Sequence, residues 1–70
     1  MFKVGDYFVY NGLHKHLHGE IAVVTRKDER VPGLCSARFE GKAQHPVGEE
    51  FAIFESGGMI PFQSTPTWEV

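Results

Sequence analysis

The sequence predicts a single small all-β domain in which five short strands curl into a barrel. Segments rich in β-branched and aromatic residues alternate with turns that contain glycine or proline, which is typical of a short-stranded β domain. No window of adequate length shows the 3.6-residue apolar period of a long helix. Because 70 residues are too few for two full sheets with a core between them, a barrel that closes its own edges is expected.

The composition favours a folded protein in a reducing compartment. Hydrophobic residues make up 41% of the chain and aromatic residues 13%, which is too much apolar material for a disordered chain. Cys35 is the single cysteine and cannot form an intramolecular disulfide, so a cytoplasmic location is expected. No secretory-signal pattern opens the chain, and no apolar run approaches the ~20 residues needed to span a bilayer. Contact with a membrane is therefore not predicted.

The first strand is expected at residues 4–10, VGDYFVY, which suit a pleated strand. Asn11-Gly12 would supply the two positive-φ positions of a two-residue hairpin turn, unless residues 11–19 form a longer irregular loop. Because side chains alternate between the faces of a strand, the residues after the turn divide into two sets. The predicted inner set is Leu13 and Leu17, on the face of Phe8 and Tyr10. The predicted outer set is His14, His16 and His18, on the face of Tyr7 and Val9.

Four further strands are predicted at residues 20–27, 34–40, 50–55 and 59–62. Residues 27–33 and 41–49 are expected to be loops. Pro61 lacks an N–H for a sheet ladder, which places the last strand at an edge. The expected interior consists of Phe8, Tyr10, Val23, Cys35, Phe39, Phe51 and Ile53. Residues 1–63 would form an SH3-like barrel, with an OB-like barrel as the alternative, and residues 64–70 a tail that trails from it or packs on it through Trp68.

The opening segment FKVGDYFVY, residues 2–10, resembles the start of the CarD-type RNA-polymerase-interacting domain. Gly5 permits a bend, Asp6 can accept hydrogen bonds from nearby backbone amides, and Phe8 and Tyr10 lead into the core. That domain is an SH3-like or Tudor-like barrel that binds the β subunit of the polymerase, and KOW-like modules open in a similar way. The resemblance implies a barrel fold and a partner such as RNA polymerase or a nucleic-acid-processing complex.

The histidines allow three interpretations. Imidazoles that alternate along a strand could bind a metal ion such as zinc, so His14, His16 and His18 are an alternative metal site, with His45 or Cys35 as a further ligand. They could instead form a face whose charge changes near pH ~6.5, or a solvated polar surface. No reaction signature is present, because Cys35 is expected inside the core and neighbouring carboxylates lie in turns. The chain is therefore predicted not to be an enzyme and to need no cofactor.

The leading functional prediction is a non-catalytic protein-binding module, or a small regulator or inhibitor, that docks on a larger partner such as the transcription machinery. Its contact surface would include an exposed edge strand and residues outside the core. These residues are Tyr7, Val9, His14, His16, His18, Val24 and Phe54. The alternative is nucleic-acid binding, in which aromatic rings stack on bases and the RKDER loop contacts phosphates. That set is Tyr10, Arg26, Lys27, Arg30 and Arg38, although a net charge of −2 lacks the dense basic face usual for such proteins.

Overall fold

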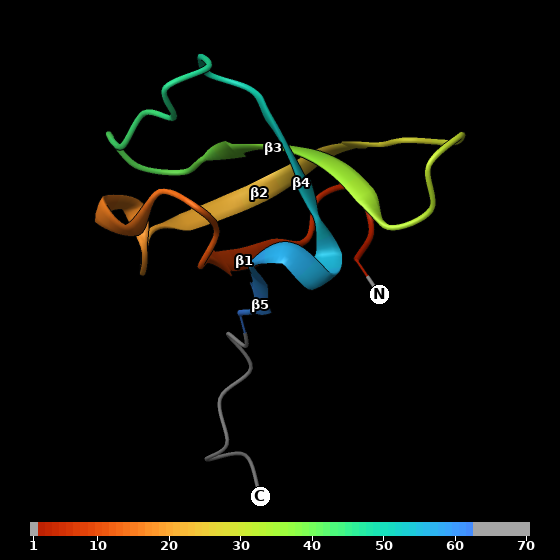
Figure 1. Cartoon of the computed structure of the whole chain (residues 1–70), viewed down its shortest axis with the longest axis horizontal. Coiled ribbons are helices and arrows are strands. Elements are labelled where there is room, and N and C mark those ends of the chain that lie inside the picture. The colour runs from red at the N-terminus through yellow and green to blue at the C-terminus, as the bar shows by residue number, and fades with distance from the viewer. Residues whose placement is uncertain (1, 63–70) are drawn as a thin grey trace, which may run out of the picture.

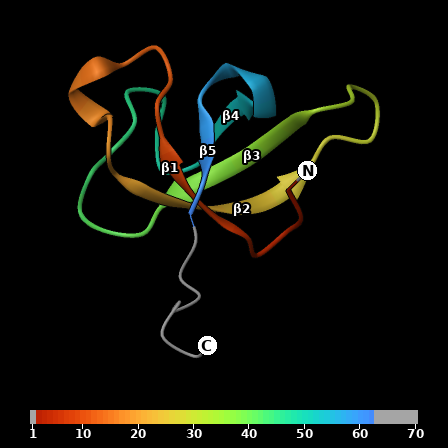
Figure 2. The ribbon, with the colours of Figure 1, turned by 90° about the horizontal axis from the view of Figure 1, so that it is seen from below.

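The computed structural model describes residues 2–62, which form one antiparallel sheet of five strands (Figure 1). The strands are β1 (Tyr7–Tyr10), β2 (Ile21–Lys27), β3 (Leu34–Phe39), β4 (Phe51–Phe54) and β5 (Met59–Pro61), in the order β4-β3-β2-β1-β5. Two short 3₁₀ turns, η1 (Lys15–Leu17) and η2 (Glu55–Gly57), follow β1 and β4. The sheet curls so that β1 and β5 cross the direction of β3 (Figure 2). The predicted all-β, five-stranded SH3-like barrel is confirmed in the form of a curled half-barrel.

A β-bulge in β2 bends the sheet. β2 pairs with β3 in regular register up to Val24, and Thr25 is then an extra residue before pairing resumes. A bulge increases the local twist and shifts the alternation of the side chains that follow it. Lys27 therefore lies on the inner side, where its ammonium donates to the Phe2 carbonyl at 2.7 Å and to the Glu55 carboxylate at 3.2 Å. This contact ties the N-terminal segment to the turn after β4.

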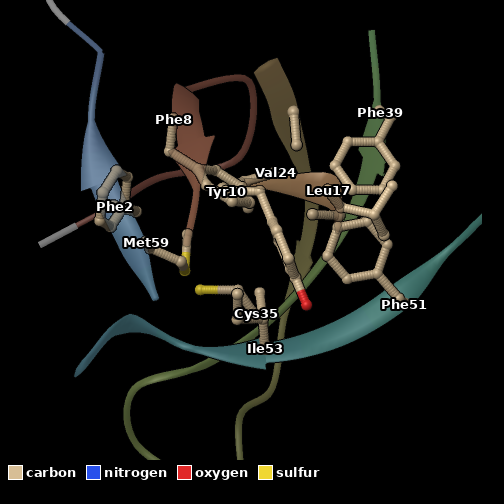
Figure 3. Packing of buried hydrophobic residues seen from close by; sticks show 12 residues of the cluster. Phe2, Phe8, Tyr10, Leu17, Val24, Cys35, Phe39, Phe51, Ile53 and Met59 are labelled. Carbon is tan, nitrogen blue, oxygen red and sulfur yellow. The ribbon is translucent and has the colours of Figure 1, made fainter. Parts of the chain in front are cut away.

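The core lies on the inner side of the curled sheet (Figure 3). Small and large side chains alternate across it, since Ala22 is paired with Phe8 on one side and with Phe39 on the other. Such complementarity fills an interior without leaving voids. The buried hydrophobic residues are Phe2, Phe8, Tyr10, Leu17, Ala22, Val24, Cys35, Ala37, Phe39, Phe51, Ile53 and Met59. The predicted interior is confirmed for every member except Val23.

The prediction for β2 is wrong about which of its faces is buried. Ala22 and Val24 are 0% and 1% exposed, whereas Val23 is only half-buried on the opposite face. The sequence pattern does not indicate which face of β2 is buried, because both alternating sets begin with apolar residues. Packing decides, because Ala22 is opposite both Phe8 and Phe39 and its small side chain leaves room for their two rings in the core. Val24, predicted to contact a partner, is therefore a core residue.

The predicted hairpin at Asn11-Gly12 does not form. β1 pairs directly with β2, so residues 11–20 are a connection that contains η1. Asn11 does not have the positive φ that a type I′ turn requires, and its N–H donates to the Gly58 carbonyl at 2.7 Å. Leu13 is 93% exposed, contrary to the prediction, whereas Leu17 is buried. The three histidines of this segment therefore do not form a stripe along a strand.

The remaining predictions for the strands are confirmed. Each of the five strands lies within its predicted range, and residues 41–49 lie in the connection between β3 and β4. Pro61 belongs to an edge strand, as expected. The predicted tail, residues 64–70 with Trp68, lies outside the described residues. Within residues 2–62, no helix has the length and apolar character needed to cross a membrane.

Candidate protein-binding site

The two edges of the sheet differ in their capacity to bind a further strand, and the β5 edge is blocked. In an antiparallel sheet, successive residues direct their N–H and C=O groups alternately toward a neighbouring strand and away from it. The hydrogen bond from Asn11 to Gly58 fixes this alternation for β5. Pro61 therefore directs its nitrogen away from β1, and proline has no N–H to offer there. A proline at this position protects the edge against pairing.

The β4 edge is open. The Glu55 N–H donates to the Gly33 carbonyl at 2.8 Å, so the backbone of Glu55 faces β3. By alternation Ile53 also faces β3, whereas Ala52 and Phe54 direct their backbone groups away from it. As the N-cap of η2, Phe54 uses its carbonyl in that turn, so the free groups of the edge are the N–H and C=O of Ala52 and the N–H of Phe54. Within the described part of the chain, no hydrogen bond outside the strand ladder and η2 reaches these groups. An edge of this kind is a template for an additional strand.

An apolar hollow of about 310 Å³ lies beside the open edge. Residues 52–54 of β4 form one wall, and residues 12–14 of the loop after β1 form the other. Phe54 is 49% exposed and Leu13 is 93% exposed, so apolar side chains on both walls are accessible. The hollow therefore combines free backbone groups with apolar surface, which are the two requirements for binding an extended peptide.

Close backbone contacts hold the loop wall of the hollow in place. Gly58 lies so near the loop that a Cβ atom there would be 2.7 Å from backbone atoms of Asn11 and Gly12. The His14 N–H donates to the hydroxyl oxygen of Tyr10 at 3.3 Å, which joins the loop to the core. The wall is thus fixed at both ends of the segment that faces β4.

The loop that carries one wall contains a lysine and histidines but no acid, whereas the β4 wall is uncharged. Residues 11–19 include Lys15 and three histidines and no acidic residue. β4 itself has the sequence FAIF. Because complementary charges guide association and set the register of a complex, an occupant of the hollow with acidic groups near the loop is favoured.

Two loops distant in the sequence meet through an imidazole cluster, defined as His14, His16 and His45. The ring of His45 stacks on Phe51 with the centroids 4.5 Å apart, and the ring of His14 lies edge-on to His45 at 4.6 Å. The rings of His14 and His16 are 6.1 Å apart. Residues 11–20 and 40–50 lie at the same end of the sheet (Figure 1). The cluster therefore closes one end of the core beside the hollow.

Acidification is expected to destabilise the protein through His45. Burial against Phe51, together with His14 and His16 nearby, holds the pKa of His45 below its ordinary value of 6.5. As the pH falls below that value, the unfolded chain binds a proton that the folded chain does not, so the free energy of unfolding decreases. Urea denaturation at about pH 7.5 and about pH 5 measures this decrease.

His45→Phe is the matched control for this prediction. It keeps an aromatic ring on Phe51 and removes the titrating group, so its stability should decrease less over the same pH range. Glu50 and Glu55 act at lower pH, because hydrogen bonds hold the pKa of each below 4.5 and their contribution is lost only below that value. Equal decreases in the wild type and the variant would contradict the role of His45.

The positions of the histidines do not support the alternative metal site. His18 is turned toward its own loop, with Nε2 2.7 Å from the Gly12 carbonyl oxygen. Cys35 is fully buried in the core and cannot join His14 at the surface. Among residues 2–62, no three His, Cys, Asp or Glu side chains lie close enough together to hold a metal ion.

A second surface contains Tyr7 and Val9, which lie on the side of β1 away from the core, as predicted. Neighbouring strands place further apolar side chains beside them. Val9 is directly opposite both Ile21 and Ile60, so the surface runs without interruption across β2, β1 and β5. We call this surface the outer apolar face, and its members are Tyr7, Val9, Ile21, Val23, Ile60 and Phe62.

The residues predicted for partner binding do not form the single surface that the hairpin implied. Because the loop after β1 turns away from the strand, these residues divide among several places. Tyr7 and Val9 belong to the outer apolar face, His14 and Phe54 border the hollow, His16 and His18 are exposed on the loop, and Val24 is buried.

The residues predicted for nucleic-acid binding do not form one basic surface. Tyr10 is 2% exposed, so its ring cannot stack on a base. Arg26 and Lys27 are each paired with a glutamate, at 3.0 and 3.2 Å. Arg26, Lys27 and Arg30 line one hollow together with Asp28 and Glu29, whereas Arg38 lines a different one. The three basic residues that meet are therefore largely matched by acidic ones, and Arg38 and Tyr10 lie apart from them, which does not suit a row of phosphates.

Comparison of the chain with protein-family models, with curated proteins and with solved structures found no match. The open β4 edge, the hollow beside it and the outer apolar face are therefore the features from which a function is inferred.

Proposed function

We propose that the protein is a non-catalytic protein-binding module that takes an extended segment of a larger partner as an additional strand on β4. The observation that carries this proposal is the direction of the Ala52 and Phe54 backbone groups, which point away from β3 at a strand that borders an apolar hollow. In strand addition, backbone hydrogen bonds supply affinity, and pockets for alternate side chains supply specificity. Because Pro61 blocks the other edge, a partner strand is directed to β4.

The walls of the hollow define the chemistry of the partner segment. One of its side chains enters between Leu13 and Phe54 and is therefore aliphatic or aromatic. Residues next to this anchor lie near Lys15 and the histidines of the loop, so they are acidic. The resemblance of residues 2–10 to the CarD-type domain favours the transcription machinery as the class of partner, with RNA polymerase as the first protein to test.

The environments of the reactive side chains support a non-catalytic role. Cys35 is fully buried, and burial raises the pKa of its thiol, so the nucleophilic thiolate is disfavoured. Glu50 accepts hydrogen bonds from Thr25 and Arg26, and Glu55 accepts one from Lys27. These carboxylates are committed to structural contacts between segments.

Ala52→Pro is the sharpest test, because it removes the N–H that faces away from β3 and leaves the β3 ladder intact. Immobilised protein is exposed to a host lysate, and the retained proteins are identified by mass spectrometry. The wild type is expected to retain a discrete partner, RNA polymerase being the one expected, and Ala52→Pro to bind it at least about tenfold more weakly. Ala52→Val adds similar bulk but keeps the N–H, so it should bind like the wild type.

Leu13→Glu is an independent variant whose folding is not in question, since Leu13 is 93% exposed. It places a negative charge where the acidic partner segment is expected, so it should also weaken retention of the partner. Equal retention by the wild type, Ala52→Pro and Leu13→Glu would contradict strand addition. If a different discrete protein shows the same dependence on both variants, strand addition stands and RNA polymerase is excluded.

A further inference from the structure

One margin of the outer apolar face carries a basic and an acidic side chain that have no ion-pair partner within residues 2–62. Arg38 is opposite Val23 in the β2–β3 ladder, and Glu40 accepts a hydrogen bond from the Tyr7 hydroxyl at 3.0 Å. Both charged side chains are exposed, and neither forms an ion pair with another residue in the range 2–62. Arg38 and Glu40 thus lie at the same β3 margin of the face.

The face itself exposes a continuous group of apolar side chains. Tyr7, Ile60 and Phe62 are 42%, 45% and 43% exposed. The ring of Tyr7 is held by its hydrogen bond to Glu40, which also raises the pKa of the tyrosine hydroxyl. Apolar residues that are exposed singly need no explanation, but a contiguous apolar group with a fixed aromatic ring and a charged rim resembles the centre of a protein interface.

We propose that two copies of this chain associate through their outer apolar faces. In a two-fold symmetric interface the same surface meets itself, so every charge on its rim must face a complementary charge on the other copy. With a two-fold axis that runs across the strands, Arg38 of each copy meets Glu40 of the other, and the apolar residues meet beside these pairs. A margin of one sign would repel itself, whereas the β3 margin of the face, with Arg38 and Glu40, is self-complementary.

The size of the domain and the position of the face both suit this association. A chain of 70 residues buries a limited core, and association is a common way to bury further apolar surface. No residue of the outer apolar face lines the hollow beside β4, so the two surfaces are separate. The dimer would therefore present two open β4 edges to a partner, which increases the avidity for a partner with two suitable segments.

Analytical ultracentrifugation over a range of protein concentrations tests the dimer. The wild type is expected to sediment as a monomer and dimer in concentration-dependent equilibrium. Ile60→Glu places a charge inside the interface and should raise the dimer dissociation constant at least about tenfold. Val47→Glu is the matched control, because Val47 is apolar and 70% exposed but lies in the loop before β4, and it should leave the dissociation constant unchanged.

Charge reversal tests the arrangement of the two copies. Arg38→Glu places acid against acid and should raise the dissociation constant at least about tenfold, whereas the double variant with Arg38→Glu and Glu40→Arg restores complementary pairs and most of the affinity. Circular dichroism confirms that each variant is folded, as expected for exposed positions. A wild type that is monomeric at every concentration would overturn the proposal. So would a dimer that resists Ile60→Glu, or a double variant that dimerises no better than Arg38→Glu.

Discussion

Gly58→Ala is expected to destabilise the protein by about 2–6 kcal/mol. Gly58 has a φ of 134°, which residues with a side chain rarely adopt, and a Cβ atom there would lie 2.7 Å from backbone atoms of Asn11 and Gly12. Backbone atoms cannot rotate aside as a side chain can, so the loop must move and the hydrogen bond from Asn11 to Gly58 is lost. Equilibrium unfolding in urea measures the change in the free energy of unfolding.

Gly48→Ala separates the two causes of this loss. Gly48 has a φ of 130°, close to that of Gly58, but apart from Gly48 and its two neighbours in the chain no atom lies within 4 Å of the place where its Cβ would be. It should therefore show only the cost of the backbone conformation, about 1–3 kcal/mol. If the two variants lose the same stability, close contact between Gly58 and the loop does not hold the wall of the hollow.

The strands could be predicted from the sequence because their signal is local. Alternation within each segment identified all five ranges and the inward residues of β3 and β4. In β2 the same signal fails, because Ala22 and Val23 are both apolar and alternation cannot choose between them. The choice depends on Phe8 and Phe39, which lie on the two neighbouring strands, so it is a property of packing across the sheet.

The loop at residues 11–19 shows how a strong turn signal can be overridden. Asn11-Gly12 favours a tight hairpin only if the residues after it can form a good strand. Residues 13–18 include three histidines and a lysine, whereas residues 21–27 are rich in β-branched residues and pair with both β1 and β3. Pairing with β2 thus provides more contacts than a hairpin with the histidine segment.

The candidate site could be predicted only in part. Pro61 identified β5 as an edge from the sequence. The open edge of β4, in contrast, depends on the register of β4 against β3. A shift of one residue would direct the backbone groups of Phe51 and Ile53 away from β3 instead of those of Ala52 and Phe54. The hydrogen bond from Glu55 to Gly33 sets that register, and it joins residues distant in the sequence. The contact between the two loops that carry His14 and His45 is likewise non-local.

Tyr10→Ala is expected to leave little folded protein. Tyr10 is 2% exposed, and its ring makes edge contacts with Phe39 at 5.5 Å and with Phe51 at 5.8 Å. Deleting a buried aromatic side chain costs about 3–5 kcal/mol. A core of this size supplies a net stability of only roughly 3–5 kcal/mol, so the free energy of unfolding of the variant falls to near zero. Collapse of the amide chemical-shift dispersion in the NMR spectrum reports the unfolding.

Tyr10→Phe separates the ring of this residue from its hydroxyl group. The ring contacts remain, and only the acceptor for the His14 N–H is lost, which costs about 0.5–1.5 kcal/mol. The variant should therefore stay folded, while the wall of the hollow that contains Leu13 loosens and partner binding weakens. A Tyr10→Ala protein with the stability of the wild type would show that the contacts of this ring with β3 and β4 do not hold the sheet in its curled form, and the β4 edge would then have no fixed hollow beside it.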